Sequence, residues 1–409
     1  MEFFQRLFGD PISLIFTLIS LAYFVRGLGL AREGWRRRDE LGQEPLTPWK
    51  KQWAERAAFY VAVPPGVLIH ELGHAAAVWL FGGRVAEFGF GFYWGYVLPA
   101  GSFTAPEDWF ISLAGTLGTL VYALVLWLIL RRSKHSPWRY TGLRTLRFHF
   151  YYALVYYPVF TLITFIGDWR TIYNFDATPV LSGVTLATHL SALGAFWWTD
   201  RQGWYEMPTF RSAEEQAELS DLREQAARLP HDHGLQLRLI DALRRSGAHK
   251  EAQEQLRAFL ADNPHSAEGH LIMAALESEQ NRFSPKSVEK HAERALQLGL
   301  PGPTNAAYAH SLLGQHYLQR EREEEAIRQL NQAINMIEKA VGPAGEPAPH
   351  QQNVAHLYYL RALAHRRQGR YEAAYQDVQK AIDRAGGAGQ APDLYENERK
   401  TIERQAERL

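Results

Sequence analysis

The chain has 409 residues, with 44 basic and 44 acidic side chains and no cysteine. The balanced charge gives no reason to expect a nucleic-acid partner. The absence of cysteine excludes disulfides and thiolate metal sites, so His, Asp and Glu are the available metal ligands.

The mean hydropathy of -0.28 averages two unlike parts of the chain. Residues 1–200 are rich in aromatic and aliphatic side chains with long uncharged runs. Residues 208–409 are rich in Ala, Glu, Gln, Arg and Leu at helical spacing. We therefore predict a membrane domain over residues 1–200 and a separate helical domain over residues 208–409.

Several apolar segments of the first part are long enough to cross a bilayer, for which about 20 residues are needed. We count five of them: Pro11–Leu30, Ala57–Phe81, Trp109–Leu130, Phe148–Tyr173 and Val180–Trp198. The first contains Arg26 and lacks a small-residue cleavage pattern, which predicts an uncleaved anchor. In the second, Pro64 and Pro65 predict a kink. The Gly- and aromatic-rich stretch Arg84–Phe103 has partial alternation and predicts a β-hairpin.

The second apolar segment carries His70-Glu71-Leu72-Gly73-His74. Histidines four residues apart share one helical face, so both imidazoles can bind one Zn²⁺ while the intervening carboxylate serves as a general base. An ionisable side chain in hydrocarbon costs roughly 2.5–3.5 kcal/mol on insertion scales, and a bound metal is the simplest partner that offsets this cost. The pattern predicts a metalloprotease site. A buried, hydrogen-bonded histidine cluster is the alternative.

A catalytic zinc usually has three protein ligands, so one more is expected from another span. Asp168 is the first candidate, because it follows a long apolar run and a glycine that lets another backbone approach. Alternatively, Asp168 is an interfacial residue beside an anchoring Trp169. Asp176, which lies beyond the span, is the second candidate. His149 and His189 are interpreted as hydrogen-bonded residues of the helix bundle.

These residues resemble the site-2 protease family of intramembrane zinc metalloproteases, particularly its compact bacterial branch. Residues 68–77 and 80–85 resemble that family's first motif and the turn into its membrane-associated β-hairpin, and residues 112–118 resemble the small-residue motif of its next helix. The resemblance covers roughly residues 57–173. It implies an all-α membrane bundle of about five transmembrane helices with a small β-hairpin. The residue roles that it implies are zinc ligation by His70, His74 and Asp168, general base catalysis by Glu71, and substrate positioning by Gly115 and Gly118.

The chain departs from the family pattern at two motifs. The second motif of the family usually has Asn-x-x-Pro a few residues before Leu-Asp-Gly. In this chain Pro158 lies ten residues before Asp168, and Gly-Asp-Trp stands in place of Leu-Asp-Gly. In the small-residue motif, Thr116 and Gly118 stand where the family often has Pro and Asn. We therefore expect this chain to handle its substrate differently.

The second part contains a recurring pattern of small, aliphatic and aromatic residues. Three copies are Leu239, Gly247, Ala252, Leu256, Phe259 and Pro264; Leu313, Gly314, Tyr317, Ala326, Leu330 and Ala333; and Ala362, Gly369, Tyr371, Ala374, Val378 and Ala381. A degenerate fourth copy lies around residues 275–296. The pattern resembles the tetratricopeptide repeat, a unit of about 34 residues in which small residues lie where two helices cross. We predict an α-solenoid that binds a peptide or protein partner in its groove. A generic helical hairpin bundle is the alternative.

Together these features predict an intramembrane zinc metalloendopeptidase that cleaves a transmembrane protein substrate, with helical repeats that recruit the substrate or a regulator. A catalytically inactive membrane scaffold that binds partners through its repeats is the alternative, and a transporter with a metal-binding histidine pair is a third. Glu71 favours the enzyme, because a structural zinc site would not require a carboxylate between its histidines.

The charges of the loops predict the orientation. The segments Ala31–Arg56 and Arg131–Arg147 are strongly basic, which places both in the cytoplasm and, with five spans, the repeats as well. We predict a multi-pass protein of a bacterial cell membrane. The same assignment puts the span ends that carry His74 and Asp168 nearer the outer face, whereas members of the family usually hold zinc closer to the cytoplasm.

Overall fold

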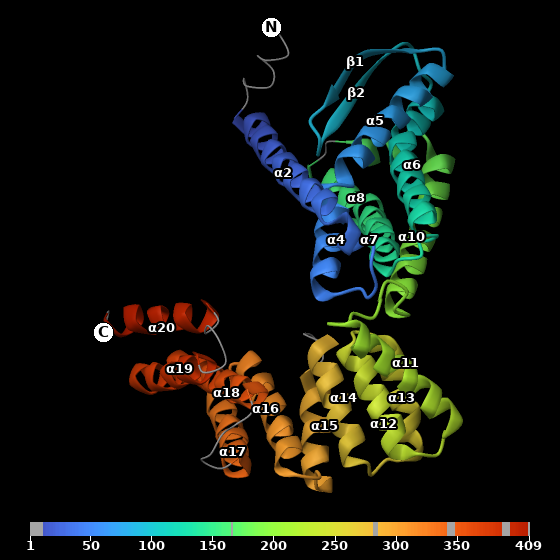
Figure 1. Ribbon diagram of the computed structural model, residues 1–409. Helices are drawn as coiled ribbons and strands as arrows, with labels where there is room; N and C mark the ends of the chain where they lie inside the picture. The colour runs from blue at the N-terminus through green and yellow to red at the C-terminus, as the bar shows by residue number, and fades with distance from the viewer. Residues whose placement is uncertain (1–10, 165–166, 281–284, 342–347, 387–392, 408–409) are drawn as a thin grey trace. The chain divides into compact units, whose positions relative to one another are not determined.

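The computed structural model describes residues 11–164, 167–280, 285–341, 348–386 and 393–407. The chain divides into two compact units. The first consists of residues 1–221 with 246–248, and the second of residues 222–245 and 249–409. Most helices of each unit are labelled in Figure 1.

The first unit is a helix bundle with one small sheet. Its helices are α2 (Pro11–Arg36), α3 (Arg38–Leu41), α4 (Pro48–Tyr60), α5 (Val63–Leu80), α6 (Ala105–Leu130), α7 (Ser136–Tyr151), the π-helical turn η1 (Tyr152–Tyr156), α8 (Tyr157–Thr164), α9 (Asp168–Ile172) and α10 (Pro179–Arg201). The helix α11 (Ala213–Arg228) follows and crosses the boundary between the units.

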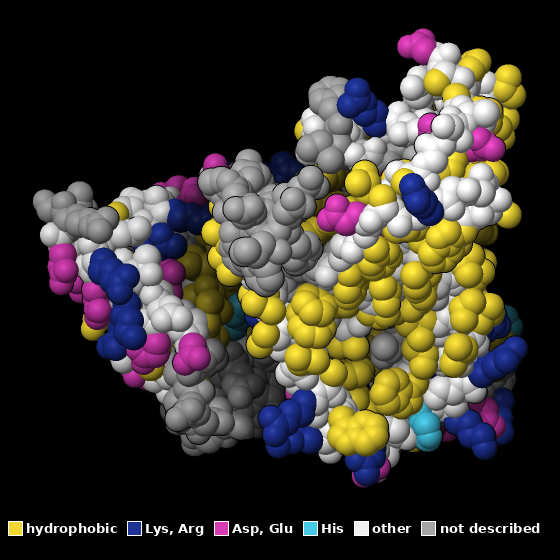
Figure 2. Space-filling model, turned by 90° about the horizontal axis from the view of Figure 1, so that it is seen from above, with side chains coloured by type: hydrophobic (Ala, Val, Ile, Leu, Met, Phe, Trp, Pro, Cys, Tyr) yellow, Lys and Arg dark blue, Asp and Glu magenta, His cyan; other side chains and the backbone are white. Residues whose placement is uncertain are grey.

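Three stretches of helix in the described residues are long and apolar enough to cross a membrane: Pro48–Leu80, which comprises α4 and α5, then α6 and α10. Their outer surfaces are apolar, with Val121 of α6 exposed by 58% and Val180 of α10 by 75%. Figure 2 shows hydrophobic side chains gathered over a broad area of one face. Water would not tolerate so large an apolar area, whereas lipid would cover it.

The predicted kink at Pro64 and Pro65 is a complete break between α4 and α5. Proline has no N–H, so Pro64 leaves the carbonyl of Tyr60 without a helical donor. The hydroxyl of Tyr93, at the tip of the sheet, donates to that carbonyl at 2.9 Å. The break therefore provides an attachment point for the sheet.

The predicted span Phe148–Tyr173 is not one regular helix in its described residues, and that it crosses a membrane stays a prediction. The helical segment begins earlier, at Ser136, passes through η1 and ends at Thr164, and α9 is a separate helix of five residues. Gly167 precedes α9 with φ 116°, a left-handed conformation that only glycine adopts easily, so the chain changes direction there.

The predicted β-hairpin is confirmed. Strands β1 (Arg84–Phe90) and β2 (Gly95–Ala100) pair antiparallel, from Arg84 opposite Ala100 to Phe90 opposite Gly95. At the tip, the ring of Phe92 stacks on Phe24 of α2 with centroids 3.7 Å apart. The sheet lies along α5 (Figure 1), which brings β2 close to the histidine motif.

The second unit consists mainly of consecutive helix pairs. The pairs are α12 (His233–Arg245) with α13 (His249–Asp262), α14 (Ala267–Gln280) with α15 (Pro285–Leu298), α16 (Pro303–Gln319) with α17 (Glu323–Val341), and α18 (Ala348–Arg367) with α19 (Tyr371–Gly386), followed by α20 (Asp393–Ala406). Ala326, Leu330 and Ala333 of α17 are fully buried. A Cβ on Gly314 would lie 2.7 Å from Cγ of Leu330, so α16 and α17 cross there. That these pairs are tetratricopeptide repeats stays a prediction.

Candidate metal centre

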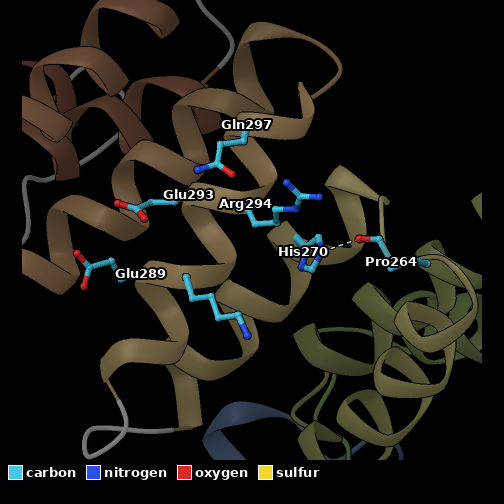
Figure 3. Close-up of a pocket in the computed structure, with 7 residues that line it drawn as sticks. Pro264, His270, Glu289, Glu293, Arg294 and Gln297 are labelled. Atoms are coloured by element: carbon cyan, nitrogen blue, oxygen red, sulfur yellow. Dashed lines mark hydrogen bonds between the residues drawn. The ribbon is translucent and has the colours of Figure 1, made fainter.

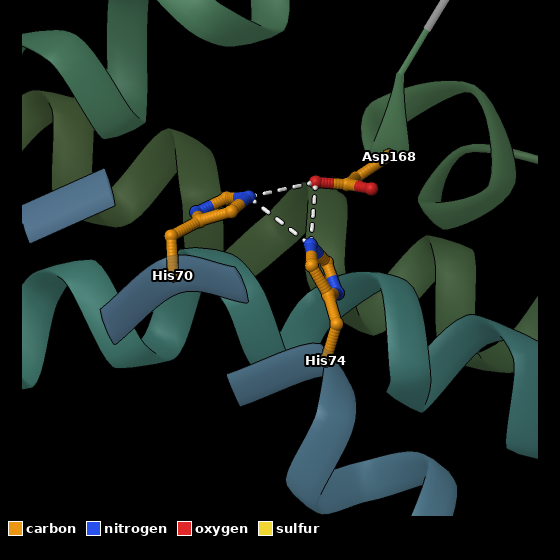
Figure 4. Close-up of side chains that lie close together, drawn as sticks. All are labelled: His70, His74 and Asp168. Carbon is orange, nitrogen blue, oxygen red and sulfur yellow. Dashed lines mark hydrogen bonds and ion pairs between the residues drawn. The ribbon is translucent and has the colours of Figure 1, made fainter. Parts of the chain in front are cut away.

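Three side chains from two helices converge inside the first unit. His70 and His74 lie on α5, and Asp168 begins α9 (Figure 4). The Nε2 atoms of the two histidines are 3.1 Å apart, and Oδ2 of Asp168 is 3.1 Å from His70 Nε2 and 3.2 Å from His74 Nε2. Among the described residues, this is the only cluster of three such side chains that could hold a metal ion.

The three donor atoms fit a tetrahedral metal. Bonds of about 2.0 Å place neighbouring ligand atoms of a tetrahedron about 3.3 Å apart, which is close to the three separations observed here. Two imidazole nitrogens and one carboxylate oxygen form a ligand set that zinc accepts, and three protein ligands leave a fourth position open. The cluster therefore suits a catalytic rather than a closed structural metal site.

The outer nitrogens of both histidines are held by hydrogen bonds. Nδ1 of His74 donates to the carbonyl of Ile111 at 2.7 Å. The hydroxyl of Thr119 donates to the carbonyl of Gly115 at 3.3 Å, so it can accept a hydrogen bond from Nδ1 of His70, which lies 3.1 Å away. With protonated Nδ1 atoms, both Nε2 atoms direct lone pairs at the cluster, as metal binding requires.

Glu71 lies beside the cluster and under the sheet. Its side chain is buried, with the residue 5% exposed. A Cβ on Gly95, the first residue of β2, would lie 2.5 Å from Cγ and 2.8 Å from Oε1 of Glu71. Only a glycine lets the strand approach the carboxylate this closely. The carboxylate of Glu71, the residue after His70, thus lies against the backbone of β2.

Glycines allow α5 and α6 to approach each other at the cluster. A Cβ on Gly115 would lie 2.3 Å from His74 Nε2 and 2.7 Å from His70 Nε2, so this glycine leaves the space that the imidazoles fill. A Cβ on Gly118 would lie 2.9 Å from the carbonyl oxygen of Ile69. Gly118 thus lies at the helix crossing. The predicted substrate-positioning role of both glycines stays a prediction.

The other candidate ligands lie elsewhere. Asp176 is exposed in the turn between α9 and α10 and is not part of the cluster. His149 is buried in α7, where its Nδ1 donates to the carbonyl of Thr145 at 2.9 Å. His189 is buried in α10, where its Nε2 donates to the carbonyl of Leu154 at 2.6 Å. Both histidines are hydrogen-bonded within the bundle.

Sequence reasoning missed Thr119, Gly95 and Tyr157 as neighbours of the cluster. Thr119 follows Gly115 by four residues, so helical spacing could have placed both on the face of α6 that meets the histidines. Gly95 carried a weaker signal, since it is one of several glycines in the hairpin. Nothing in the sequence indicated Tyr157, because the direction in which its side chain points depends on the π-helical turn before it.

The second unit has an open pocket on α14 and α15, with a volume of about 550 Å³ (Figure 3). Its lining contains both cationic and anionic side chains, among them Lys290, Arg294 and Glu293. His270 also lines it and donates from Nε2 to the carbonyl of Pro264 at 3.1 Å. Burial, together with the nearby His270 and Lys290, lowers the pKa of His291 to about 4, so that histidine is neutral at physiological pH.

Part of the chain matches the model of a known family. Residues 57–229 match the model of the Peptidase M50B-like family. The M50 peptidases are integral membrane metalloproteases of the site-2 protease family, so the predicted resemblance is confirmed for this region at the level of the family. No curated protein matches the chain. The matched region contains both histidines, Glu71, the sheet and Asp168.

Proposed function

We propose that the protein is an intramembrane zinc metalloendopeptidase that hydrolyses peptide bonds in or near transmembrane segments of a protein substrate. The convergence of His70, His74 and Asp168 next to a buried Glu71 carries this proposal. Two of these ligands lie in a helix that is long and apolar enough to cross a membrane. The family match to residues 57–229 supports the same class of enzyme.

The proposed chemistry assigns one role to each side chain. His70 and His74 through Nε2 and Asp168 through Oδ2 would hold Zn²⁺, which when bound supplies a Lewis acid and makes water more acidic. Glu71 takes one proton from the attacking water as the new C–O bond forms at the scissile carbonyl. As the C–N bond breaks, Glu71 gives this proton to the leaving nitrogen, so that it ends the cycle ionised.

The sheet is the proposed guide for the substrate backbone. A transmembrane helix hides its carbonyls in internal hydrogen bonds, so the segment has to be extended before it can be cleaved. In the part of the chain that the structure describes, the sheet has two strands, so both are edge strands. An extended substrate can pair with such an edge. Because Gly95 of β2 lies against Glu71, pairing at the sheet would bring substrate carbonyls near the base.

We further propose five spans, formed by the three apolar stretches with α2 and the helical segment from α7 to α8. The two basic segments support a common side for their loops, because they pack together. Ser136 N–H donates to Oε1 of Glu44 at 2.6 Å, and the hydroxyl of Tyr140 donates to Oε1 of Glu55 at 2.8 Å. The charge rule makes that side cytoplasmic and places the repeats there.

The helix pairs of the second unit are the proposed recruitment element. Stacked helix pairs present extended surfaces that bind peptides. The pocket beside Lys290, Arg294 and Glu293 offers both signs of charge to a polar tail of the substrate or of a regulator. Binding there would raise the concentration of the tail near the membrane domain.

Zinc content of the detergent-purified protein tests the proposed function. We expect about one zinc per wild-type chain and its loss in His70→Ala and Asp168→Ala. His149→Ala and Asp176→Ala are matched controls, since neither residue belongs to the cluster, and both should keep zinc. A wild-type protein without zinc would instead favour an inactive scaffold.

A further inference from the structure

Besides the hydroxyl of Thr119, a second hydroxyl group contacts the cluster of candidate metal ligands without belonging to it. The side chain of Tyr157, the first residue of α8, donates to Oδ2 of Asp168 at 2.9 Å. Oδ2 is also the oxygen that faces both histidine Nε2 atoms. The ring of Tyr157 meets the ring of His70 edge to face, with centroids 5.6 Å apart.

The direction of Tyr157 depends on an irregular stretch of helix. The π-helical turn η1 ends immediately before this residue, and Pro158 follows it. Proline has no N–H, so the carbonyl of Leu154, four residues earlier, loses its helical donor. His189 of α10 supplies a replacement, because its Nε2 donates to that carbonyl at 2.6 Å. A turn of this kind is common at functional sites, where it rotates the side chains that follow it.

The same histidine supports the helix that carries Asp168. Its Nδ1 accepts a hydrogen bond from the hydroxyl of Tyr173, the residue that follows α9. The ring of Trp169, in α9, packs against His189 with centroids 4.6 Å apart. His189 therefore connects the turn that directs Tyr157 with the helix that begins at Asp168.

Gly167 allows Asp168 and Tyr157 to approach each other. A Cβ on Gly167 would lie 2.4 Å from Cγ2 of Thr161 and 3.1 Å from the hydroxyl oxygen of Tyr157. Any other residue would push the start of α9 away from α8. The Gly167 conformation, with φ 116°, is also one that side chains disfavour. Close approach of Asp168 to Tyr157 is thus built into the backbone.

We propose that Tyr157 is a positioning residue that holds Asp168 as the third metal ligand and selects Oδ2 as the ligating oxygen. A carboxylate oxygen can accept more than one interaction, so the phenol can occupy one side of Oδ2 while the metal occupies another. Without this hydrogen bond the carboxylate could rotate and offer either oxygen. The inference rests on the proposed function, since it requires that the cluster binds a metal.

Zinc affinity measured by competition with a chromophoric chelator tests the role of Tyr157 in the full-length, detergent-purified protein. Tyr157→Phe keeps the aromatic ring and removes only the hydroxyl. We expect zinc to bind roughly 10–100-fold more weakly, which is the usual effect of losing a partner of a metal ligand. With zinc in excess, the KM for a membrane substrate should stay unchanged.

The matched control is Tyr122→Phe. Tyr122 also donates a hydrogen bond from a partly buried hydroxyl, to the carbonyl of Ala62 at 3.0 Å, but makes no contact with the cluster. Its variant should bind zinc like the wild type. Equal affinity in Tyr157→Phe and the wild type overturns the inference and leaves the proposed function standing. A wild-type protein that binds no zinc overturns both.

A second variant keeps the test decisive if Tyr157→Phe does not fold. His189→Ala leaves Tyr157 intact but removes the group that holds both η1 and α9. We expect weaker zinc binding in the same direction, by a smaller factor. Wild-type zinc affinity in a folded His189→Ala protein would then count against the inference.

Discussion

Both units have a glycine where two helices cross, but the two glycines make room for different kinds of side chain. In the second unit, Gly314 lets Leu330 of the partner helix fill the crossing, and the result is a dry aliphatic contact. In the first unit, Gly115 leaves space for the imidazoles of His70 and His74. In both units the glycine leaves room for a side chain of the neighbouring helix. In the second unit that side chain only packs, whereas in the first unit it is a candidate metal ligand.

The two units also differ in where their apolar side chains lie. Val121 and Val180 of the first unit are more than half exposed, whereas Leu330 and Val378 of the second are fully buried. Helices that face lipid need no apolar core to drive their folding, and glycines and polar contacts hold them together. Helices in water need that core. The exposed apolar side chains of the first unit agree with the integral membrane family whose model it matches.

The largest effect is expected at Glu71, the proposed general base, which lies in the first unit. Glu71→Gln should keep zinc and fold but lose roughly 10²–10⁴-fold in proteolysis, because an amide cannot accept the proton of water. Cleavage of a co-expressed membrane substrate measures this. Asp108→Asn, which changes an exposed carboxylate at the start of α6, is the control and should cleave normally. Normal cleavage by Glu71→Gln would remove Glu71 as the base.

The next effect concerns the glycine that admits the imidazoles. Gly115→Ala should weaken zinc binding by roughly 10–100-fold, since its Cβ would lie 2.3 Å from His74 Nε2 and displace a ligand. Gly183→Ala, on α10, is the matched control because a Cβ there would meet nothing within 4 Å. Equal zinc affinity in both variants would show that α6 can move away from the histidines at little cost.

The corresponding glycine of the second unit should affect folding rather than zinc binding. Gly314→Ala should destabilise the helix pairs by about 1–3 kcal/mol, the usual range for overpacking, because its Cβ would press on Leu330. Urea unfolding of a fragment of residues 208–409, followed by circular dichroism, measures the change. Gly299→Ala is an unsuitable control because its φ of 84° would add strain. Zinc content of the full-length Gly314→Ala variant should stay at the wild-type level, and a loss of zinc would break the comparison between the units.

The sequence predicted those features of the site that depend on neighbours along the chain. His70, Glu71 and His74 lie within one turn and a half of helix, so their spacing alone places them together. The hairpin followed from local alternation and glycine content. Asp168 was suggested by the glycine before it and by the family resemblance, and the structure brings it to the histidines.

The features that the sequence did not predict depend on irregular backbone. The predicted fourth span ran through Gly167, although a left-handed glycine there separates α8 from α9. Tyr157 reaches Asp168 because a π-helical turn changes the phase of the helix, and no periodic pattern contains that phase change. Thr119 and Gly95 contact residues far away in sequence, so helical spacing could place Thr119 on the face of α6 that meets the histidines but could not identify its partner His70 or the contact of Gly95 with Glu71.

The smallest effect should come from deleting the second unit, and it tests whether the two units share one task. If the helix pairs recruit a tail of the substrate, a chain that ends at residue 221, where the first unit ends, should keep its zinc and cleave the natural target more slowly. We expect a loss of roughly tenfold, below the 10²–10⁴ of full bivalent linkage, because the membrane already confines both proteins.

A short unstructured reporter has no tail to bind, so its cleavage should not change. The ratio of the two rates, measured in the same vesicles, separates recruitment from catalysis. An equal loss of cleavage rate on both substrates would mean that the second unit stabilises the membrane domain. The small residues of the helix pairs would then contribute to the stability of the enzyme rather than to the choice of its substrate.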